Sequence, residues 1–213
     1  MLPADSRPGT LLEVLWSAGR RAPGRGIRVF RAGREVEHLS YAELYEDAGR
    51  IAGGLSDRHG ELRGERIALV FPTSGDYLRA FFGVLAAGAT PVPLPAPLRF
   101  SSPERFGERI RGALCQSRIR LLLGSEKVVP ILEALAAVLG LPAHVHSLAD
   151  LRQRCPAWQE LAPQDSALVQ YTSGSTAAPK GVVLTHGQIV ANLDAVHRAL
   201  AMQANDVCCS WLP

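Results

Sequence analysis

The sequence predicts an α/β fold built from mainly parallel sheets flanked by helices, and three observations support it. Short apolar runs, such as residues 66–71 and 119–123, have the length and composition of buried strands. Longer segments with apolar residues at helical spacing, such as residues 75–88, lie between these runs. Glycine or proline separates many of the segments, as expected where one element ends and the next begins. Strands that alternate with helices in this way form a sheet covered on both faces.

The first 60 residues are predicted to form two helices on either side of a hairpin. Residues 10–13 carry a capping-box pattern, which opens a helix that runs to about residue 21. Residues 27–39 alternate around a central Ala-Gly turn and predict the hairpin. A second capping box at residues 40–43 opens a helix that ends near Gly60.

The central part of the chain carries the alternation of strands and helices. Prolines within residues 90–94 favour an edge strand, because proline cannot donate a ladder hydrogen bond. The predicted strands are residues 66–71, 90–94, 119–123 and 143–146, and the predicted helices are residues 75–88, 103–117, 127–139 and, as one or two turns, 148–154.

The last part of the chain is predicted as a separate unit. Two apolar runs, residues 167–169 and 182–184, have the composition of buried strands, and residues 206–213 start a further strand. A third capping box precedes a helix whose apolar residues are expected to pack against the sheet. We therefore divide the chain into a first α/β part at residues 1–156, a linker at 157–164, and a unit at 165–213 that is truncated at its C-terminal end.

Composition and charge limit the class of protein. The 213 residues are 47% hydrophobic, which is ample for a packed core, and the net charge of +3 predicts no nucleic-acid partner. The sequence has no signal-peptide pattern and no uninterrupted apolar stretch that would span a membrane, so we expect a cytoplasmic protein. The four cysteines form no C-x-x-C pair and are expected to be buried free thiols.

A polar loop between the two last strands has the composition of a polyanion site. Glycine lets the backbone approach a ligand closely, hydroxyl groups donate hydrogen bonds, and lysine adds a point charge for phosphate. The loop is not a Walker A sequence, because Pro179 stands where the second glycine belongs. A polar surface hairpin is the alternative interpretation. The candidate binding residues are Thr172, Ser173, Gly174, Ser175, Thr176, Lys180 and Gly181.

The order of residues in this loop resembles a known family. Residues 171–176, followed by Pro179, Lys180 and Gly181, are similar to the phosphate-binding loop of adenylate-forming enzymes. These include acyl-CoA synthetases, non-ribosomal adenylation domains, luciferases and fatty acyl-AMP ligases. Ala177 stands where the family usually has glycine, and a small non-glycine residue there is typical of fatty acyl-AMP ligases. Residues 81–97 also resemble the family, and their proline-rich end is closest to the same branch.

The resemblance implies an acyl-adenylate synthetase N-terminal domain that uses ATP and Mg²⁺ to activate a carboxylic acid, here a fatty acid, to an acyl-adenylate. The residues implied to hold the departing phosphates are Thr172, Ser173, Ser175, Thr176 and Lys180. The implied partner is an acyl carrier protein, and the alternatives are an acyl-CoA synthetase fragment or a non-catalytic truncated binding module. The family's acidic metal ligand, ribose-binding aspartate and C-terminal lysine domain are not found, so catalytic and metal-binding residues stay unassigned. We expect the first third of a larger enzyme, inactive alone.

Several other residues are functional candidates. His144 and His146 share one face of a predicted strand, as metal ligands can, but no third ligand is evident and a structural role is favoured. His186 follows a capping threonine, and its default role is to start a helix. Phe81 and Phe82 are interpreted as core residues rather than as an acyl pocket.

Overall fold

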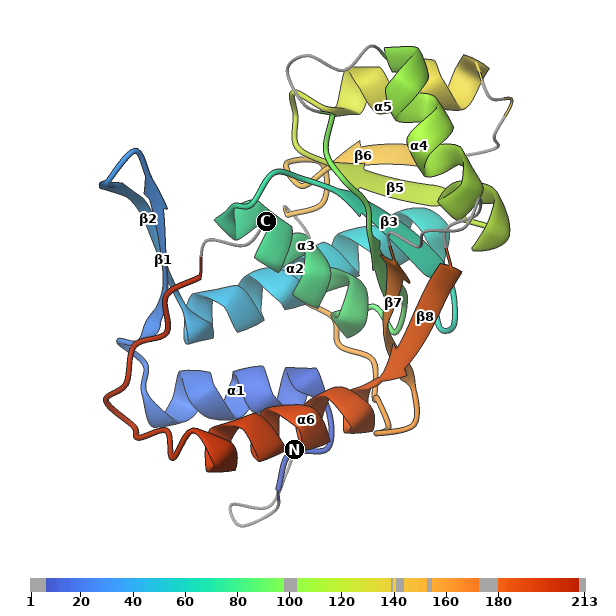
Figure 1. Cartoon of the computed structure of the whole chain (residues 1–213). Coiled ribbons are helices and arrows are strands. Elements are labelled where there is room, and N and C mark those ends of the chain that lie inside the picture. Colours follow the sequence, from blue (N-terminus) through green and yellow to red (C-terminus); the bar gives the residue numbers. More distant parts are fainter. Residues whose placement is uncertain are drawn as a thin grey trace.

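The computed structural model describes residues 7–97, 103–138, 140, 144–152, 155–172 and 180–210. Figure 1 shows a central sheet with helices on both faces and a smaller two-stranded sheet beside it. A hairpin projects from one end of the molecule. The predicted α/β architecture with a parallel sheet is therefore confirmed.

The central sheet consists of four parallel strands in the order β4-β3-β5-β6. They span Arg66–Val70 (β3), Thr90–Pro93 (β4), Leu121–Gly124 (β5) and His144–Ser147 (β6). β4 lies at the edge of this sheet, as its prolines predict. The amides of Thr90 and Leu94 donate to carbonyl oxygens of Glu65 and Leu69, at 2.8 and 2.9 Å. The prolines alternate with these donors, so the missing N–H groups of Pro91 and Pro93 disrupt no ladder bond.

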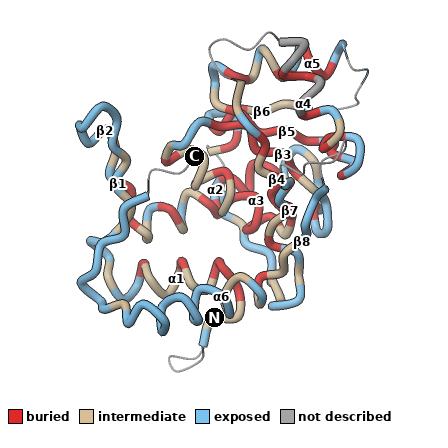
Figure 2. Tube along the Cα trace, in the orientation of Figure 1, coloured by how far each residue is buried: buried red, intermediate tan, exposed pale blue. Residues whose placement is uncertain are grey.

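Two pairs of helices cover the two faces of this sheet. The helices span Tyr41–His59 (α2), Gly75–Ala86 (α3), Pro103–Gln116 (α4) and Val129–Val138 (α5). Ile67, Leu69 and Leu123 point into a core shared with α2 and α3. Ala68, Val70 and Leu122 alternate with them and point into a second core under α4 and α5. Side chains alternate along a strand, so one run of apolar residues serves both cores, and Figure 2 shows this buried centre.

The N-terminal elements form as predicted. They are α1 (Leu11–Arg21), β1 (Gly26–Arg31) and β2 (Arg34–Ser40). The capping boxes before α1 and α2 are complete, with the Thr10 and Ser40 hydroxyls accepting from backbone amides three residues on. The hairpin turn places Ala32 at φ 49° and Gly33 at φ 76°, the left-handed pair that a tight hairpin requires.

Residues 155–160 lie against α2 and α3. The amide of Ala157 donates to the Gly49 carbonyl oxygen at 2.9 Å, and Trp158 stacks on Tyr45 with ring centroids 5.5 Å apart. A Cβ atom at Gly53 would lie 2.0 Å from the Cys155 carbonyl oxygen, so this close approach requires glycine. The proposed linker at residues 157–164 stays a prediction, since this packing does not define a domain boundary.

The last part of the chain contains β7 (Ser166–Thr172), β8 (Lys180–Thr185) and α6 (His186–Ala199). β7 and β8 form an antiparallel pair beside the edge strand β4, and the Thr90 hydroxyl donates to the Ser166 carbonyl oxygen at 3.3 Å. The complete capping box at Thr185 confirms the third predicted helix start.

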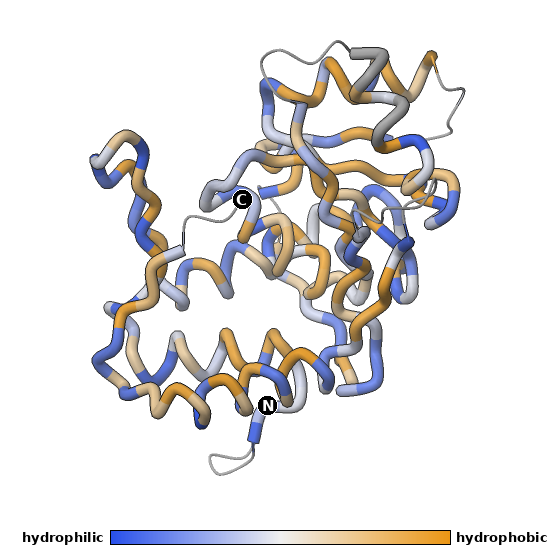
Figure 3. Tube along the Cα trace, viewed as in Figure 1, coloured by the Kyte–Doolittle hydropathy of each residue, from blue (hydrophilic) through white to orange (hydrophobic). Residues whose placement is uncertain are grey.

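Burial differs from the prediction in this part of the chain. β8 was expected to be buried, but Val182 and Val183 are each 44% exposed, because β8 pairs only with β7 among the described residues. α6 was expected to pack against the sheet. Ile189 and Val190 in its first turns do pack against the core cluster that includes strand residues, but the helix continues alongside α1, and Leu193 and Leu200 are exposed (Figure 1). Figure 3 shows the resulting apolar stretch along α6.

Residues 148–152 form one turn, as expected, in which the amides of Leu151 and Arg152 both donate to the Leu148 carbonyl oxygen, and residues 153–154 lie outside the described residues. Two smaller expectations need correction. Residues 206–210 form no strand, because no strand edge within the described residues pairs with them. All four cysteines are exposed rather than buried. On α4, for example, the buried positions Ile110, Ala113 and Leu114 face the sheet, which leaves Cys115 on the outer side.

Candidate functional site

The two ends of the polar loop face each other across the β7–β8 ladder. Thr172 and Lys180 are register partners, and the Thr172 hydroxyl donates to the Lys180 carbonyl oxygen at 3.4 Å. Both residues are exposed. Within the described residues no carboxylate lies within ion-pair distance of the Lys180 ammonium group. The structure therefore presents a hydroxyl and an unneutralised cation together at the mouth of the loop.

The remaining loop candidates lie outside the described residues. They are Ser173, Gly174, Ser175 and Thr176. Their assignment rests on the sequence pattern, while the structure shows the two strands that carry the loop.

Gly181 has a packing role that sequence analysis did not anticipate. It lies in β8 opposite Tyr171, and a Cβ atom there would lie 3.2 Å from both Tyr171 Cζ and Val169 Cγ1. The absence of a side chain lets the Tyr171 ring lie across the strand. No left-handed backbone conformation is involved, so the conformational freedom expected of a loop glycine is not used at Gly181.

Tyr171 connects the base of the loop to α4. Its hydroxyl donates to the Ala113 carbonyl oxygen at 3.1 Å and lies 2.7 Å from Ser117 Oγ. The ring packs against the core under α4 and α5. Sequence analysis missed this function of Tyr171. A tyrosine where an apolar strand enters a polar loop was the available signal, but its partners come from a distant segment.

His186 ties α6 to α1. It is fully buried, and its Nδ1 atom accepts a hydrogen bond from the Leu11 backbone amide at 3.2 Å. This contact fixes the tautomer with hydrogen on Nε2, which has no partner within the described residues. Burial lowers the pKa of His186, against an opposing effect of Asp165 and Glu13. Besides starting a helix, as expected, His186 therefore joins two distant helices.

Acidification is expected to loosen this contact. Because the folded-state pKa of His186 lies below its ordinary value of 6.5, the unfolded chain binds more protons below that pH. The stabilisation is fully present above about pH 6.5 and is lost as the pH falls, by at most about 1.4 kcal/mol per pH unit for one group. His186→Asn keeps an acceptor near Nδ1 but cannot titrate. Urea unfolding between pH 7 and 5 should therefore show a shallower decline for the variant, whereas equal slopes would contradict the assignment.

The strand histidines lie at the amino-terminal edge of the parallel sheet. His146 Nε2 is 2.9 Å from Nε2 of His59, and the His59 and His144 ring centroids are 5.1 Å apart. A cavity of about 250 Å³ beside them is lined by residues that include Arg66 and Arg120. Within the described residues no group of three or more His, Cys, Asp or Glu side chains is arranged to hold a metal. The His59–His146 contact therefore joins α2 to β6.

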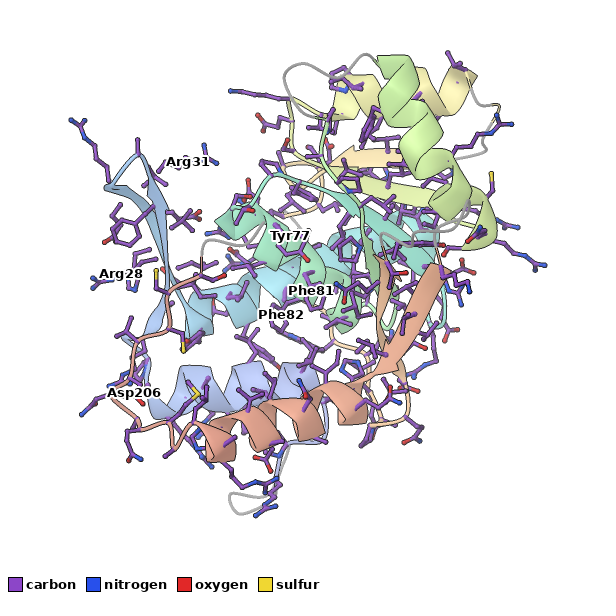
Figure 4. The ribbon with its side chains drawn as sticks, viewed as in Figure 1. Arg28, Arg31, Tyr77, Phe81, Phe82 and Asp206 are labelled. Carbon is purple, nitrogen blue, oxygen red and sulfur yellow. The ribbon has the colours of Figure 1, made fainter. Side chains whose placement is uncertain are left out.

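Phe81 and Phe82 pack at the edge of the core. Both are partly buried against the cluster shared by α2 and α3, and their rings meet edge to face with centroids 5.5 Å apart. Tyr77 continues the same aromatic group along α3 (Figure 4). This packing supports the core interpretation made from the sequence.

Comparison with protein families identifies the chain's relatives. The model of the family described as AMP-binding enzyme matches residues 15–213, almost the whole chain. The chain belongs to the AMP-binding enzyme family. The family consists of adenylate-forming enzymes, which use ATP and Mg²⁺, so the family resemblance drawn from residues 171–181 is confirmed.

Curated AMP-binding relatives come from several branches. Syringomycin synthase SyrB1 of Pseudomonas syringae is 31% identical, with 96% of this chain and 31% of the relative covered. The medium-chain-fatty-acid–[acyl-carrier-protein] ligase JamA of Moorena producens is 30% identical, with 84% and 31% covered. The long-chain-fatty-acid–AMP ligase FadD23 of Mycobacterium tuberculosis is 31% identical, with 83% and 31% covered. The chain spans about a third of the length of these relatives.

Solved structures of AMP-binding proteins share the fold. A structure from a study of fatty acyl-adenylate ligases of E. coli and L. pneumophila superposes with a TM-score of 0.87 at 30% identity, covering 96% of this chain and 37% of that one. The McyG A-PCP structure complexed with phenylalanyl-adenylate gives a TM-score of 0.80 at 28% identity, covering 95% and 32%. The chain is thus related to fatty acyl-AMP ligases and to non-ribosomal adenylation domains. None of the described helices combines the length and apolar character needed to cross a bilayer.

Proposed function

We propose that the chain forms the phosphate-binding part of an ATP-dependent ligase that activates a fatty acid to an acyl-adenylate for transfer to a carrier protein. The observation that carries this proposal is the geometry at the loop mouth. Thr172 and Lys180 meet across the last ladder pair of β7 and β8, and both are exposed. A lysine on a flexible stem without a neighbouring carboxylate is suited to a polyphosphate.

The chemistry follows from the family. A carboxylate oxygen attacks the α-phosphorus of ATP, the bond to the β-phosphate oxygen breaks, and pyrophosphate leaves with the electron pair. The roles proposed for this chain are binding and charge neutralisation of the β- and γ-phosphates. The residues proposed for this are Thr172, Ser173, Gly174, Ser175, Thr176, Lys180 and Gly181. Bound Mg²⁺ would neutralise further charge on the departing group.

The choice of a fatty acid and a carrier protein rests on two kinds of support. Ala177 and the proline-rich residues 95–97 resemble the fatty acyl-AMP ligase branch. Two relatives at about 30% identity carry the names of a fatty-acid–AMP ligase and of a fatty-acid–carrier-protein ligase. An acyl-CoA synthetase is the competing member of the same family.

ATP–pyrophosphate exchange that depends on fatty acid tests this proposal. The complete gene product that contains residues 1–213 is expected to exchange label with fatty acids and to pass the acyl group to a carrier protein but not to CoA. The 213-residue chain alone is expected to give background exchange, because it spans about a third of its relatives. Transfer to CoA would favour the synthetase alternative, and an absence of exchange with every carboxylic acid would refute the ligase assignment.

A further inference from the structure

The connection between Tyr171 and α4 points to a function beyond packing. Tyr171 directly precedes Thr172, and its register partner Gly181 directly follows Lys180. The tyrosine therefore belongs to the ladder pair next to the one that carries the loop. Any shift of this pair moves both ends of the loop together.

The hydroxyl of Tyr171 is held by two directional hydrogen bonds. It has a single proton, which it donates to the Ala113 carbonyl oxygen at 3.1 Å. Ser117 Oγ, 2.7 Å away, must therefore donate to the tyrosine oxygen. We call these two hydrogen bonds of the Tyr171 hydroxyl the anchor. Ala113 and Ser117 are both buried, at 3% and 5% exposure, so the loss of a hydrogen bond at this place is costly.

The ring and the hydroxyl of Tyr171 act separately. The ring packs over Gly181 and against the core under α4 and α5, and this contact remains if the hydroxyl is removed. The Ala113 carbonyl oxygen also accepts from the Ser117 amide at 3.0 Å, so it keeps a partner in a phenylalanine variant. Removal of the hydroxyl alone is therefore expected to leave the fold intact. The end of β7 would then no longer be held against α4 and could change its orientation.

We propose that the Tyr171 hydroxyl is a positioning group, which fixes the end of β7 to the last turn of α4 and so holds Thr172 and Lys180 in register for the polyphosphate. This inference rests on the proposed function of the loop. Two consequences distinguish it from a purely structural role. The amides at the mouth of the loop gain mobility without the hydroxyl, and polyphosphate binding weakens while the bound acid is unaffected.

Hydrogen exchange of the 213-residue chain tests the anchor directly. Ser117→Ala should speed exchange of the ladder amides among residues 170–172 and 180–182 about five-fold, the equivalent of one net hydrogen bond, and Tyr171→Phe should speed it by at least as much. The double variant should be no faster than Tyr171→Phe, since Tyr171→Phe already removes the bond between Tyr171 and Ser117. Tyr45→Phe is the matched control, and the β1–β2 hairpin amides should exchange at the same rate in all variants.

Kinetics of the complete gene product test the positioning role. In Tyr171→Phe we expect the KM for pyrophosphate in the exchange reaction to rise about five- to ten-fold, with the KM for fatty acid unchanged. A merely structural role would lower the amount of active enzyme, and so kcat, with both KM values unchanged.

The outcomes separate the inference from the proposed function. Unchanged exchange of the ladder amides among residues 170–172 and 180–182 in Tyr171→Phe overturns the anchor, whatever the enzyme assay shows. Faster exchange with an unchanged KM for pyrophosphate overturns the positioning role. A wild-type protein that exchanges no pyrophosphate with any acid refutes the proposed function and the positioning role with it, while the anchor is still judged by hydrogen exchange.

Discussion

Replacement of Arg79 by alanine is expected to lower the free energy of unfolding by about 3 kcal/mol, the low end of the range for removing one partner of a buried ion pair. Arg79 Nε donates to Asp47 at 2.8 Å, and Nη1 donates to Glu37 and to Asp76. Its side chain is only 14% exposed. The variant would remove the cation that joins the carboxylates of β2, α2 and α3, and Asp47 and Asp76 would keep only Arg50 and Arg152 as ion-pair partners.

Arg50→Ala is the matched control for this prediction. Arg50 pairs with Glu46 and also with Asp47, at 3.6 and 3.5 Å, but its side chain is 46% exposed. Exposed pairs of this kind contribute less than about 1 kcal/mol. Urea unfolding followed by circular dichroism at pH 7 measures both variants. Equal effects of Arg79→Ala and Arg50→Ala would show that burial of the network contributes nothing.

Lys180→Ala is expected to reduce kcat/KM for ATP in the complete gene product by about 30- to 1000-fold, or about 2–4 kcal/mol. This is the scale of losing a preorganised electrostatic group that contacts the departing phosphates. Because Lys180 is exposed at the end of β8, thermal unfolding should move by no more than about two degrees. The measurement combines ATP-dependent adenylation kinetics with a melting curve.

The other lysine of the chain provides the control. Lys127 is exposed in the turn before α5, and Lys127→Ala changes net charge by the same amount without touching the loop. Its kinetics should match the wild type. If Lys180→Ala also leaves kcat/KM for ATP unchanged, the lysine does not contact phosphate and the whole loop assignment loses its basis.

Several elements could be predicted because their determinants are local. The helices after Thr10, Ser40 and Thr185 begin where predicted, since each capping box satisfies backbone amides within three residues. The edge position of β4 follows from its prolines, which cannot donate to a second neighbour. The loop motif could be recognised for the same reason, because all the residues that define it lie within a dozen consecutive positions.

Burial at the end of the chain could not be predicted in the same way. Val182 and Val183 read as buried residues because they are apolar, yet their exposure depends on which strand or helix lies over β8. The apolar face of α6 likewise shows that some surface must cover it, without showing whether that surface is a sheet or another helix. An apolar side chain favours burial, but the sequence does not show which strand or helix will cover it. That depends on how the elements are arranged in the folded protein.

By itself the sequence determined the order of most strands and helices, the starts of three helices, and the family that residues 171–181 resemble. Only the tertiary structure decided which distant groups meet. Tyr171 and Ser117 are 54 residues apart, and Leu11 and His186 are 175 residues apart. Such pairs leave no periodic or spacing signal, because contacts between residues far apart in the chain depend on the packing of whole elements. The anchor of the loop therefore became visible only when β7 was placed against α4.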